Sequence, residues 1–399
     1  MEGLNHNPGG VHMGKKLVVL GCGNVGSDVA RYLAAEGAAE EILVADYNLD
    51  AAEALAKEIG AKAVKFNATD PESVRETISG ADVVFNGVGP FHRFALPIIE
   101  QAIAAGVHYV DINDDFDVAM ALVSTDKYDQ AAKEAGVTVL FGAGSTPGLT
   151  NILARWGADQ LDKAEAVHVS WGCSFAPAMS SAVIDHLFHC LTGDVPQFID
   201  GKHVDIPAWS GERIIELQPP FGTYTYSFSG HAESVTLPKY LPGLRHATTR
   251  STFFQEEGNE LYKKLIALGL ADTEVIPKLG ISPRTFLAHY MSTPAAAEAL
   301  AVDYGTDTLG AVFRVDVEGE LNGCRTQIIY EIHIVDFGKD PTSTCAANAV
   351  LDILSGKVTQ AGVYAPEAII DPEPFVTKVM SKLGANLHRK MVQLDTIKA

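Results

Sequence analysis

The run GCGNVG, residues 21–26, constrains this chain more than any other segment. It directly follows the apolar run KKLVVL, which is typical of a buried strand, and it opens a stretch with helical spacing. In such a unit Gly21 permits the tight turn, Gly23 lets the backbone approach a pyrophosphate, and Gly26 lets helix and strand pack closely. The helix N-terminus, with Asn24 and Val25, stabilises the phosphate charge. The run therefore predicts a dinucleotide-binding site.

The second apolar run ends in an acidic residue, Asp46, twenty residues after Gly26. A carboxylate at this place accepts hydrogen bonds from the adenosine ribose hydroxyls. The same carboxylate repels the 2′-phosphate of NADP, and Tyr47, Asn48 and Leu49 offer no cation to offset it. NAD is therefore the expected cofactor, unless a basic residue from elsewhere in the chain reverses the preference.

Apolar runs continue to alternate with helix-like stretches, and about six strands are expected by residue 142. This alternation predicts an α/β fold, with an N-terminal Rossmann domain of doubly wound parallel sheet over residues 15–145. Short alternating runs such as TYTYSF and ESVTL, and a hairpin turned by Asn322-Gly323, then predict a second, α+β domain over 146–340. Residues 341–399 are expected to form helices, and 1–14 a flexible leader.

Composition excludes several function classes. The chain carries 50 acidic and 30 basic residues, a formal charge of −20, which repels nucleic acid. No window is apolar over the roughly eighteen residues that a membrane span requires, so no membrane partner is expected. The five cysteines are scattered without a CxxC spacing, which favours a reducing, cytoplasmic location. We expect His186, His189 and Cys190 to be partly buried helix residues, and no metal is predicted.

Segments that follow the predicted strands are the candidates for ligand contact, because ligands of open α/β sheets lie beyond the carboxyl ends of the strands. After the fourth run, two glycines and a proline indicate close backbone passage past the cofactor. The candidate cofactor contacts there are Asn86, Gly87, Val88 and Gly89, with Phe91 as a candidate substrate contact and His92 near the nicotinamide end.

The fifth run ends in three carboxylates within five residues. Asp111 is a candidate cofactor contact, and Asp114 and Asp115 are candidate catalytic groups, although such a cluster could instead cap the following helix. The sixth run is followed by the small-residue loop GAGSTPGLTN, in which Thr146 is a candidate substrate contact. Free amides of this loop could hold a substrate carboxylate, or the loop could be a hinge between domains.

The motifs GCGNVG, NGVGPF, YVDIND, GAGSTPGLTNILA, GHAESVTLPKY and GVYAPE occur in this order between about residues 15 and 375. Together they resemble the saccharopine dehydrogenase family, especially its shorter members, which include lysine 6-dehydrogenase. The resemblance implies a Rossmann domain joined to a catalytic and dimerisation domain, with C-terminal helices that return to the Rossmann side. It also implies nicotinamide-dependent chemistry at a carbon–nitrogen bond of an amino acid, often in a homodimer. Asp46 departs from the NADP-using members.

Hydride leaves a carbon next to nitrogen only when that nitrogen is neutral. An alkylammonium has a pKa of about 10.4, so its deprotonation at pH 7 costs about 4.6 kcal/mol. Asp114, Asp115 or His92 could take this proton. His231 and Glu233 are candidates for holding the substrate amine, or else are strand residues on a solvated face. Arg250 is the first candidate for a substrate carboxylate, with Arg245 and Arg213 as reserves.

Three classes of function remain open. The first is an NAD-dependent oxidoreductase of carbon–nitrogen bonds, with lysine 6-dehydrogenase-like oxidative deamination ahead of saccharopine- or carboxynorspermidine-type reductive condensation. The second is an NAD-binding sensor without redox turnover. The third is a dehydrogenase of carbon–oxygen bonds, which is disfavoured because the YxxxK pair of short-chain alcohol dehydrogenases is missing at the appropriate distance from the glycine run.

Overall fold

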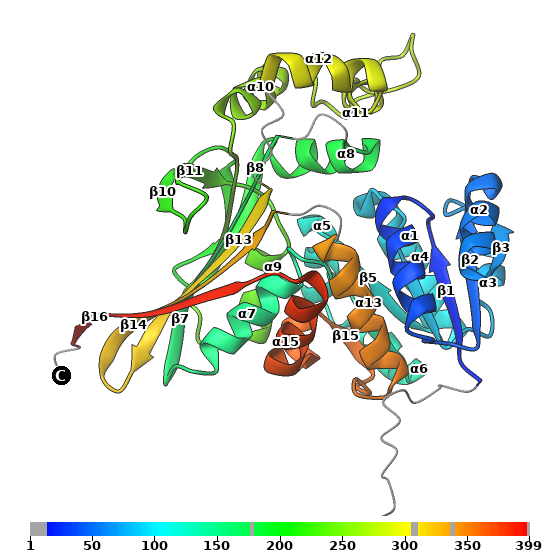
Figure 1. Cartoon of the computed structure of the whole chain (residues 1–399), viewed down its shortest axis with the longest axis horizontal. Helices are drawn as coiled ribbons and strands as arrows, with labels where there is room; N and C mark the ends of the chain where they lie inside the picture. Colours follow the sequence, from blue (N-terminus) through cyan, green and yellow to red (C-terminus); the bar gives the residue numbers. More distant parts are fainter. Residues whose placement is uncertain (1–13, 176–178, 305–309, 336–339, 397–399) are drawn as a thin grey trace, which may run out of the picture.

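The computed structural model describes residues 14–175, 179–304, 310–335 and 340–396. The chain forms two β-sheets with helices between and beside them (Figure 1). The α/β fold predicted from the strand–helix rhythm is confirmed. Most of the expected leader, residues 1–13, lies outside the described residues. None of the helices in the described ranges is long and apolar enough to cross a bilayer.

The first sheet has seven strands in the order β15-β6-β5-β4-β1-β2-β3, and all neighbours are parallel. The strand order reverses between β1 and β4, so the loops after these two strands diverge and leave a crevice at their carboxyl ends. The glycine run follows β1 at this position. The strands are β1 (Lys16–Leu20), β2 (Glu41–Asp46), β3 (Lys62–Lys65), β4 (Val83–Asn86), β5 (His108–Asp111), β6 (Thr138–Leu140) and β15 (Gly362–Tyr364).

Helices cover both faces of this sheet, and one of them comes from the C-terminal part of the chain (Figure 1). The apolar stripe predicted for residues 50–60 forms the buried face of α2, at Ala52, Leu55 and Ala56. α13 packs beside α1 and shares its core, so the C-terminal helices return to this sheet as expected. The helices are α1 (Asn24–Ala35), α2 (Leu49–Ile59), α3 (Pro71–Ile78), α4 (Phe91–Ala105), α5 (Phe116–Val123), α6 (Lys127–Ala135) and α13 (Pro341–Leu354).

The second sheet is mixed and follows the order β10-β11-β12-β7-β13-β14-β16, with β8 and β9 attached beside β12. Asn322 and Gly323 turn the β13–β14 hairpin with φ of 52° and 71°, which confirms the predicted left-handed turn. The strands are β7 (Lys163–Cys173), β8 (Asp194–Ile199), β9 (Lys202–Pro207), β10 (Arg213–Glu216), β11 (Thr223–Phe228), β12 (His246–Phe253), β13 (Ala311–Leu321), β14 (Cys324–Ile334) and β16 (Leu387–Thr396).

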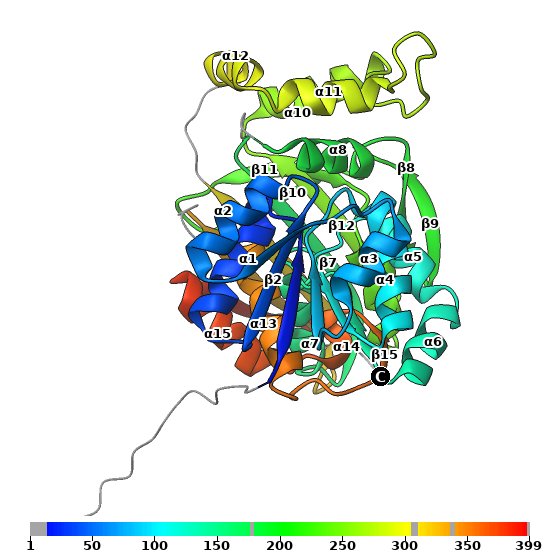
Figure 2. The same cartoon turned by 90° about the vertical axis from the view of Figure 1, so that its right-hand side faces the viewer.

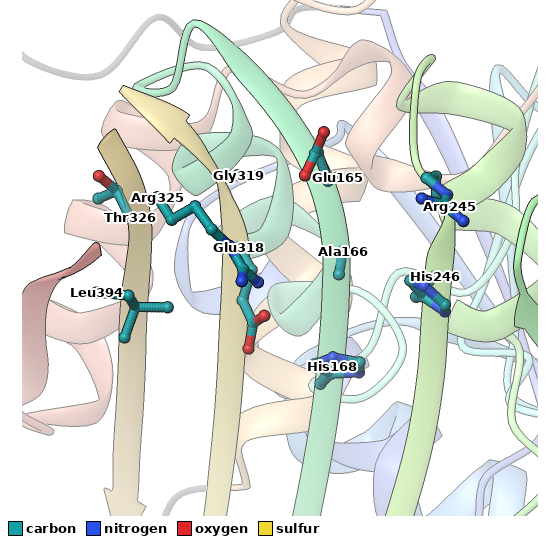
Figure 3. A pocket seen from close by; sticks show the side chains of 10 residues that line it. All are labelled: Glu165, Ala166, His168, Arg245, His246, Glu318, Gly319, Arg325, Thr326 and Leu394. Atoms are coloured by element: carbon teal, nitrogen blue, oxygen red, sulfur yellow. The ribbon is translucent and has the colours of Figure 1, made fainter. Parts of the chain in front are cut away.

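One face of this sheet is apolar and packs on helices α7 (Leu149–Ala158), α9 (Glu233–Tyr240) and α15 (Pro372–Leu383), which lie between the two sheets in Figure 1. Its opposite face carries charged side chains. Figure 3 shows a hollow on that face, where His168 of β7, His246 of β12 and Glu318 of β13 lie side by side. No helix of the described residues covers this charged face in Figure 1.

Three elements differ from the sequence prediction. One of them is β15, a strand of the first sheet within residues that were expected to be helical. The run ESVTL is the start of α9 and not a strand, because every residue from 233 to 237 is buried and its hydroxyls find hydrogen-bond partners in distant segments. Ser234 Oγ, for example, donates to the carbonyl of Pro196 at 2.8 Å. The last part of the chain was expected to be helical, but β16 pairs with the edge of β14 there.

A further group of helices lies beyond the upper end of the second sheet. α11 (Pro283–Met291) packs on α8 (Ser181–Cys190), and the helices α10 (Glu256–Ala267) and α12 (Pro294–Tyr304) complete this layer above α8 (Figure 2). The short α14 (Pro366–Ile369) packs on α7. α8 is thereby held over the carboxyl ends of the parallel strands, where its polar face meets the loop after β5.

Candidate active site at the carboxyl ends of the parallel strands

The glycine run has the geometry that a pyrophosphate requires. Gly21 has a φ of 88°, and a Cβ at Gly26 would lie 1.9 Å from the carbonyl oxygen of Gly21. Neither position therefore tolerates a side chain. A Cβ at Gly23 would meet nothing within 4 Å, so space is open at the N-terminus of α1. This cradle fits a dinucleotide phosphate.

Asp46 ends β2 beside this cradle. Its Oδ2 accepts a hydrogen bond from the backbone N–H of Cys22 at 2.7 Å, and its Oδ1 accepts one from that of Asn48 at 2.8 Å. The carboxylate is thus held in place with lone pairs left for ribose hydroxyls. The structure also brings a cation nearby, because Lys65 pairs with Asp46 in the sheet and its Nζ lies 5.4 Å from the ring centroid of Tyr47.

Two of the predicted cofactor contacts are internal supports. Asn86 and Asp111 are fully buried. Asn86 Nδ2 donates to the hydroxyl of Tyr109 at 2.9 Å, and that hydroxyl donates to Asp111 Oδ2 at 2.7 Å. Asp111 Oδ1 accepts from the backbone N–H groups of Asn113 and Gly142. Burial raises the pKa of Asp111 to about 6. In the structure these side chains fasten the strand-end loops, and their contact with a cofactor stays a prediction.

The loop after β4 borders the glycine run. A Cβ at Gly21 would lie 3.0 Å from the carbonyl carbon of Gly87 and 3.3 Å from Val88 Cγ2. Gly87, Val88 and Gly89 are partly exposed and remain candidate cofactor contacts. Phe91 is different, because its ring is buried in the core between the sheet and α4. The burial of Phe91 does not support the substrate contact predicted for it.

Asp115 lies at the centre of a polar cluster. Its Oδ2 accepts from the backbone N–H of His92 at 2.7 Å and lies 3.2 Å from His92 Nδ1. Its Oδ1 is 2.9 Å from Nδ1 of His186, which comes from α8. The adjacent Asp114 Oδ1 is 3.3 Å from the same nitrogen. The structure thus brings together the three predicted catalytic residues and adds one from 71 positions later in the chain.

The two neighbouring carboxyl groups of this cluster, Asp114 and Asp115, have pKa values shifted in opposite directions. Burial alone would raise the pKa of Asp115, but hydrogen bonds from His186 and His92 outweigh it and hold this pKa well below the ordinary value. Burial and the nearby charge of Asp115 raise the pKa of Asp114 despite the opposing effect of His186. Burial lowers the pKa of His186, but the charge of Asp114 and the hydrogen bond with Asp115 reverse this and raise it well above 6.5.

Two further α8 residues reach the cluster from its other side. Asp185 Oδ2 lies 3.6 Å from His92 Nε2. The ring of His189 stacks on that of His92, with 4.8 Å between centroids, and Nε2 of His189 lies 3.4 Å from Asp117 Oδ1. His186 and His189 are partly buried helix residues, as expected, but both face carboxylates of the loop after β5.

His231 and Glu233 form a buried pair at the start of α9. His231 Nδ1 donates to Glu233 Oε2 at 2.5 Å, and the other carboxylate oxygen accepts from Thr146 Oγ1 at 2.5 Å and Thr150 Oγ1 at 3.0 Å. Burial would raise the pKa of Glu233, but the charge of His231 and these hydrogen bonds lower it. Glu233 is therefore ionised at neutral pH and holds the proton of His231 on Nδ1. Thr146, which was predicted to contact the substrate, donates its hydroxyl hydrogen bond to Glu233 of this pair.

The ring of His231 lies beside those of two other site residues. It is 5.6 Å from the ring of His186 and 5.8 Å from that of Trp171, both measured between centroids. His231 also belongs with Asp114 and His186 to a group whose donor atoms lie within 4.8 Å of one another. His231 and Glu233 are thus buried at the cluster, and not on a solvated strand face.

Arg250 points away from this cluster. In the pairing of β12 with β7, Arg250 lies opposite Ser170, whereas Ser251 lies opposite Trp171. Alternate residues of a strand point to opposite faces, so Arg250 lies on the face away from Trp171 and His231. The substrate-clamp role predicted for Arg250 is therefore wrong.

The three arginines predicted as candidates for a substrate carboxylate make their contacts on the charged face of the second sheet. The guanidinium of Arg250 donates to the carbonyl of Gly211 at 3.0 Å and lies 3.9 Å from the ring centroid of Phe228. Arg213 lies 3.9 Å from Asp316 on the same face. Arg245 lines the hollow of Figure 3 and donates to Asp200. Neither reserve arginine reaches the cluster.

Sequence reasoning missed the arginines closer to the site. Arg93 follows His92 at the start of α4, has an exposed side chain, and forms no ion pair among the described residues. Arg284 of α11 is buried, and its charge is close enough to interact with those of Asp185 and Asp115. The pattern HR at a strand end could have indicated Arg93. No local signal indicates Arg284, which the helical layer brings in.

Comparison with known proteins agrees with this geometry. Residues 17–140 match a family model described as saccharopine dehydrogenase NADP binding domain. These residues are therefore similar to dinucleotide-binding domains of that type. The match covers the glycine run, Asp46 and the carboxylates after β5, and it does not decide between NAD and NADP.

Over nearly its whole length the chain is similar to saccharopine dehydrogenase-like proteins. It is 28% identical to carboxyaminopropylagmatine dehydrogenase of Synechocystis, over 94% of this chain and 97% of the relative. It is 23% identical to carboxynorspermidine synthase of Vibrio alginolyticus, over 83% of each chain. The solved structure of saccharopine dehydrogenase (L-Glu forming) from Saccharomyces cerevisiae covers 95% of this chain and is itself fully covered, with a TM-score of 0.67 at 17% identity, which shows the shared fold.

Proposed function

We propose that this protein is an NAD(P)-dependent enzyme of reductive condensation, which joins a cationic amine to a carbonyl compound that carries a carboxylate. The observation that carries the proposal is the cluster of histidines and carboxylates beside the dinucleotide cradle, with the buried His231–Glu233 pair in it. The names of the two relatives, each of which describes a carboxylated polyamine, support this reading over the lysine 6-dehydrogenase-like one.

The acidic side chains of the cluster fit an amine. Asp114, Asp115, Asp117 and Asp185 lie next to the histidines of the cluster, and they outnumber the arginines whose charge reaches it. Such a group of carboxylates stabilises a cationic substrate and disfavours an anionic one at the same position. A polyamine-type substrate, which carries more than one charged nitrogen, would satisfy more of these groups than a simple monoamine.

His231 is the proposed proton carrier. Because Glu233 accepts the hydrogen bond from Nδ1 of His231, Nε2 of this imidazole is the atom that would accept a proton from the substrate. It takes this proton from the incoming ammonium, whose neutral amine then adds to the carbonyl carbon. The same proton is given to the hydroxyl of the adduct, which departs as water and leaves a C=N bond. A reduced dinucleotide held at the glycine cradle would supply hydride to that carbon, which would give a secondary amine.

Arg93 is the proposed anchor for the substrate carboxylate. It lies in the first turn of α4, where the N-terminal end of the helix also favours negative charge. Its exposed guanidinium follows His92, so a carboxylate bound there would lie next to the cluster. Replacement Arg93→Ala is expected to raise KM for the carboxylate-bearing substrate and to leave KM for the amine nearly unchanged.

NAD is the proposed preferred cofactor, because the carboxylate of Asp46 lies where the 2′-phosphate of NADP would bind. Lys65 acts in the opposite direction, since it pairs with Asp46 in the sheet and its ammonium lies 5.4 Å from the ring centroid of Tyr47. Homodimer formation and a cytoplasmic location remain predictions.

The proposed function is tested by following dinucleotide oxidation with the purified protein. NADH and NADPH are offered with a panel of diamines and polyamines, with small aldehydes and oxo acids that carry a carboxylate, and with both together. Oxidation that requires both partners supports condensation, and mass spectrometry should detect the secondary amine. His231→Ala should lower kcat by about 100-fold or more while the dinucleotide still binds.

Other outcomes support the alternatives. Reduction of NAD by lysine alone, without a carbonyl partner, would favour oxidative deamination. Tight dinucleotide binding without turnover of any pair would favour the sensor.

A further inference from the structure

A second arrangement within the polar cluster has the features of a metal site. His92, Asp115 and His189 each offer a donor atom, and these atoms lie within 4.8 Å of one another. The three residues come from the start of α4, the residue before α5, and α8, so they converge from separate parts of the chain. In a tetrahedral zinc site the donor atoms lie roughly 3.4 Å apart, so small side-chain rotations would bring these three donor atoms to that separation.

Each of these imidazoles has a carboxylate at its far nitrogen. Asp185 Oδ2 lies 3.6 Å from Nε2 of His92, and Asp117 Oδ1 lies 3.4 Å from Nε2 of His189. Histidines that bind a metal through one ring nitrogen commonly donate the other N–H to a carboxylate, which fixes the tautomer. This arrangement leaves Nδ1 of both rings as the donor atoms, and Nδ1 of His92 already lies 3.2 Å from Asp115 Oδ2.

Two polar atoms of this arrangement lack hydrogen bonds. Asp185 Oδ2 and His189 Nε2 are buried and have no hydrogen-bond partner among the described residues, and Asp185 is only 8% exposed. Buried groups without partners cost free energy, and each calls for a physical explanation. A metal ion bound at Nδ1 of each ring provides this explanation. Both rings would then carry their proton on Nε2 and direct it at Asp185 and Asp117.

In the neighbouring group of Asp114, His186 and His231, no buried side-chain nitrogen or oxygen is left without a hydrogen-bond partner. His231 Nδ1 is bonded to Glu233, and His186 Nδ1 is bonded to Asp115, so these rings already have strong partners. His231 is also the proposed proton carrier of the reaction. The two groups therefore divide the cluster into a proton-transfer side and a cation-binding side that share the loop after β5.

We propose that His92, Asp115 and His189 bind one divalent transition metal ion, with Zn²⁺ the best match to two imidazoles and a carboxylate. Three protein ligands leave one tetrahedral position open for water or a substrate oxygen. The proposal goes beyond reductive condensation and does not depend on it, because the donor set and its carboxylates exist whichever reaction the protein catalyses.

Metal binding to the full-length protein tests this directly. The chain is stripped with a chelator, dialysed into metal-free buffer, and titrated with Zn²⁺ alone by isothermal calorimetry, without dinucleotide or substrate. Retained metal is counted by mass spectrometry. The expected result is one equivalent per chain with micromolar or tighter affinity. Co²⁺ in its place should give the visible absorption of a four-coordinate site.

Variants locate the ion. His189→Ala removes a ligand and should lower the affinity by at least 100-fold, whereas Asp185→Asn should lower it by about 10- to 100-fold through the orientation of His92. His203→Ala, on β9 outside the cluster, is the matched control and should bind as the parent chain does. Circular dichroism and dinucleotide binding show that each variant is folded.

Three results would overturn the proposal. They are the absence of stoichiometric Zn²⁺ binding, binding that His189→Ala and Asp185→Asn leave unchanged, and binding abolished only by His231→Ala, which would place the ion in the neighbouring group. The condensation activity is measured separately with amine and carbonyl, so a failure of metal binding is distinguished from a failure of the proposed reaction.

Discussion

Buried carboxyl groups in this protein differ in protonation because they differ in hydrogen-bond donors. Glu233 has His231, Thr146 and Thr150 as donors and is ionised. Glu367 of α14 is equally buried, yet among the described residues neither of its carboxyl oxygens has a hydrogen bond of full geometry, although Thr236 and Asn151 lie close enough to oppose the rise in its pKa. Burial raises the pKa of Glu367 to about 7. One carboxyl can therefore orient a histidine, whereas the other is a neutral acid over much of the acidic pH range.

Glu367 should make the protein less stable as pH rises. Below about pH 4.5 it is protonated in both the folded and the unfolded chain, and above about pH 7 it is ionised in both. Between these values the folded chain binds more protons, so the free energy of unfolding falls with rising pH, by up to about 3 kcal/mol.

The measurement is urea unfolding of the parent chain and Glu367→Gln at pH 5 and pH 8. Glutamine keeps the shape and removes the titration, so the variant should gain stability relative to the parent at pH 8. An equal difference in unfolding free energy at both pH values would refute the assignment.

Asp46 and Lys65 should act oppositely on cofactor choice. Asp46→Ala removes the ribose acceptor and should weaken NAD binding by about 10-fold or more, while NADP binding is unchanged or tighter. Lys65→Ala should weaken NADP alone. Dissociation constants from fluorescence titration decide this, and an unchanged NAD to NADP ratio in Asp46→Ala would show that another residue sets the preference.

At the scale of elements, the β1–turn–α1 unit was predictable because its constraints are local. Gly26 is required by its contact with the carbonyl of Gly21 within the unit, Gly21 by its positive φ, and Gly23 by the pyrophosphate that the unit is proposed to bind. The strand–helix alternation and the Asn322-Gly323 turn were predictable for the same reason. α9 was not, because alternating apolar and hydroxyl residues suit a strand unless the surroundings bury both sets, as they do for Ser234 and Thr236.

Two glycines of that unit should separate stability from binding. Gly26→Ala places a Cβ against the carbonyl of Gly21 and should lower the free energy of unfolding by about 1–3 kcal/mol. Gly23→Ala meets nothing, and its φ of −73° suits alanine, so stability should change by less than about 0.5 kcal/mol.

Dinucleotide affinity should nevertheless fall in Gly23→Ala, because the methyl group occupies the approach of the pyrophosphate. Thermal unfolding measures the stability of the two variants, and calorimetric titration measures their affinity for the dinucleotide. A Gly23→Ala chain with parental affinity would mean that the phosphates lie elsewhere.

At the scale of the whole molecule, one hydrophobic core runs from the parallel sheet to the mixed sheet. Val19 of β1, Ile152 of α7, Ala349 of α13 and Val167 of β7 are fully or almost fully buried members of the same cluster. α13 and α15 lie between the sheets in Figure 1 and connect them. The cradle and the polar cluster are therefore held in a fixed relation by shared packing.

This continuous core should make unfolding cooperative. Differential scanning calorimetry is expected to show one transition whose calorimetric and van't Hoff enthalpies agree, and saturating dinucleotide should move the whole transition to higher temperature. Two separate transitions, with only one shifted by dinucleotide, would show that the two sheets unfold independently.

The sequence by itself determined the Rossmann-type sheet, the glycine cradle, Asp46 at its edge and the polar strand ends, because short-range backbone geometry and spacing specify all of these. Only the tertiary structure decided which polar residues meet. α8 joins Asp115 from 71 positions away, α9 buries His231 with Glu233, and strand pairing turns Arg250 to the opposite face. Side-chain direction and long-range docking depend on packing between distant segments, and no local pattern encodes them.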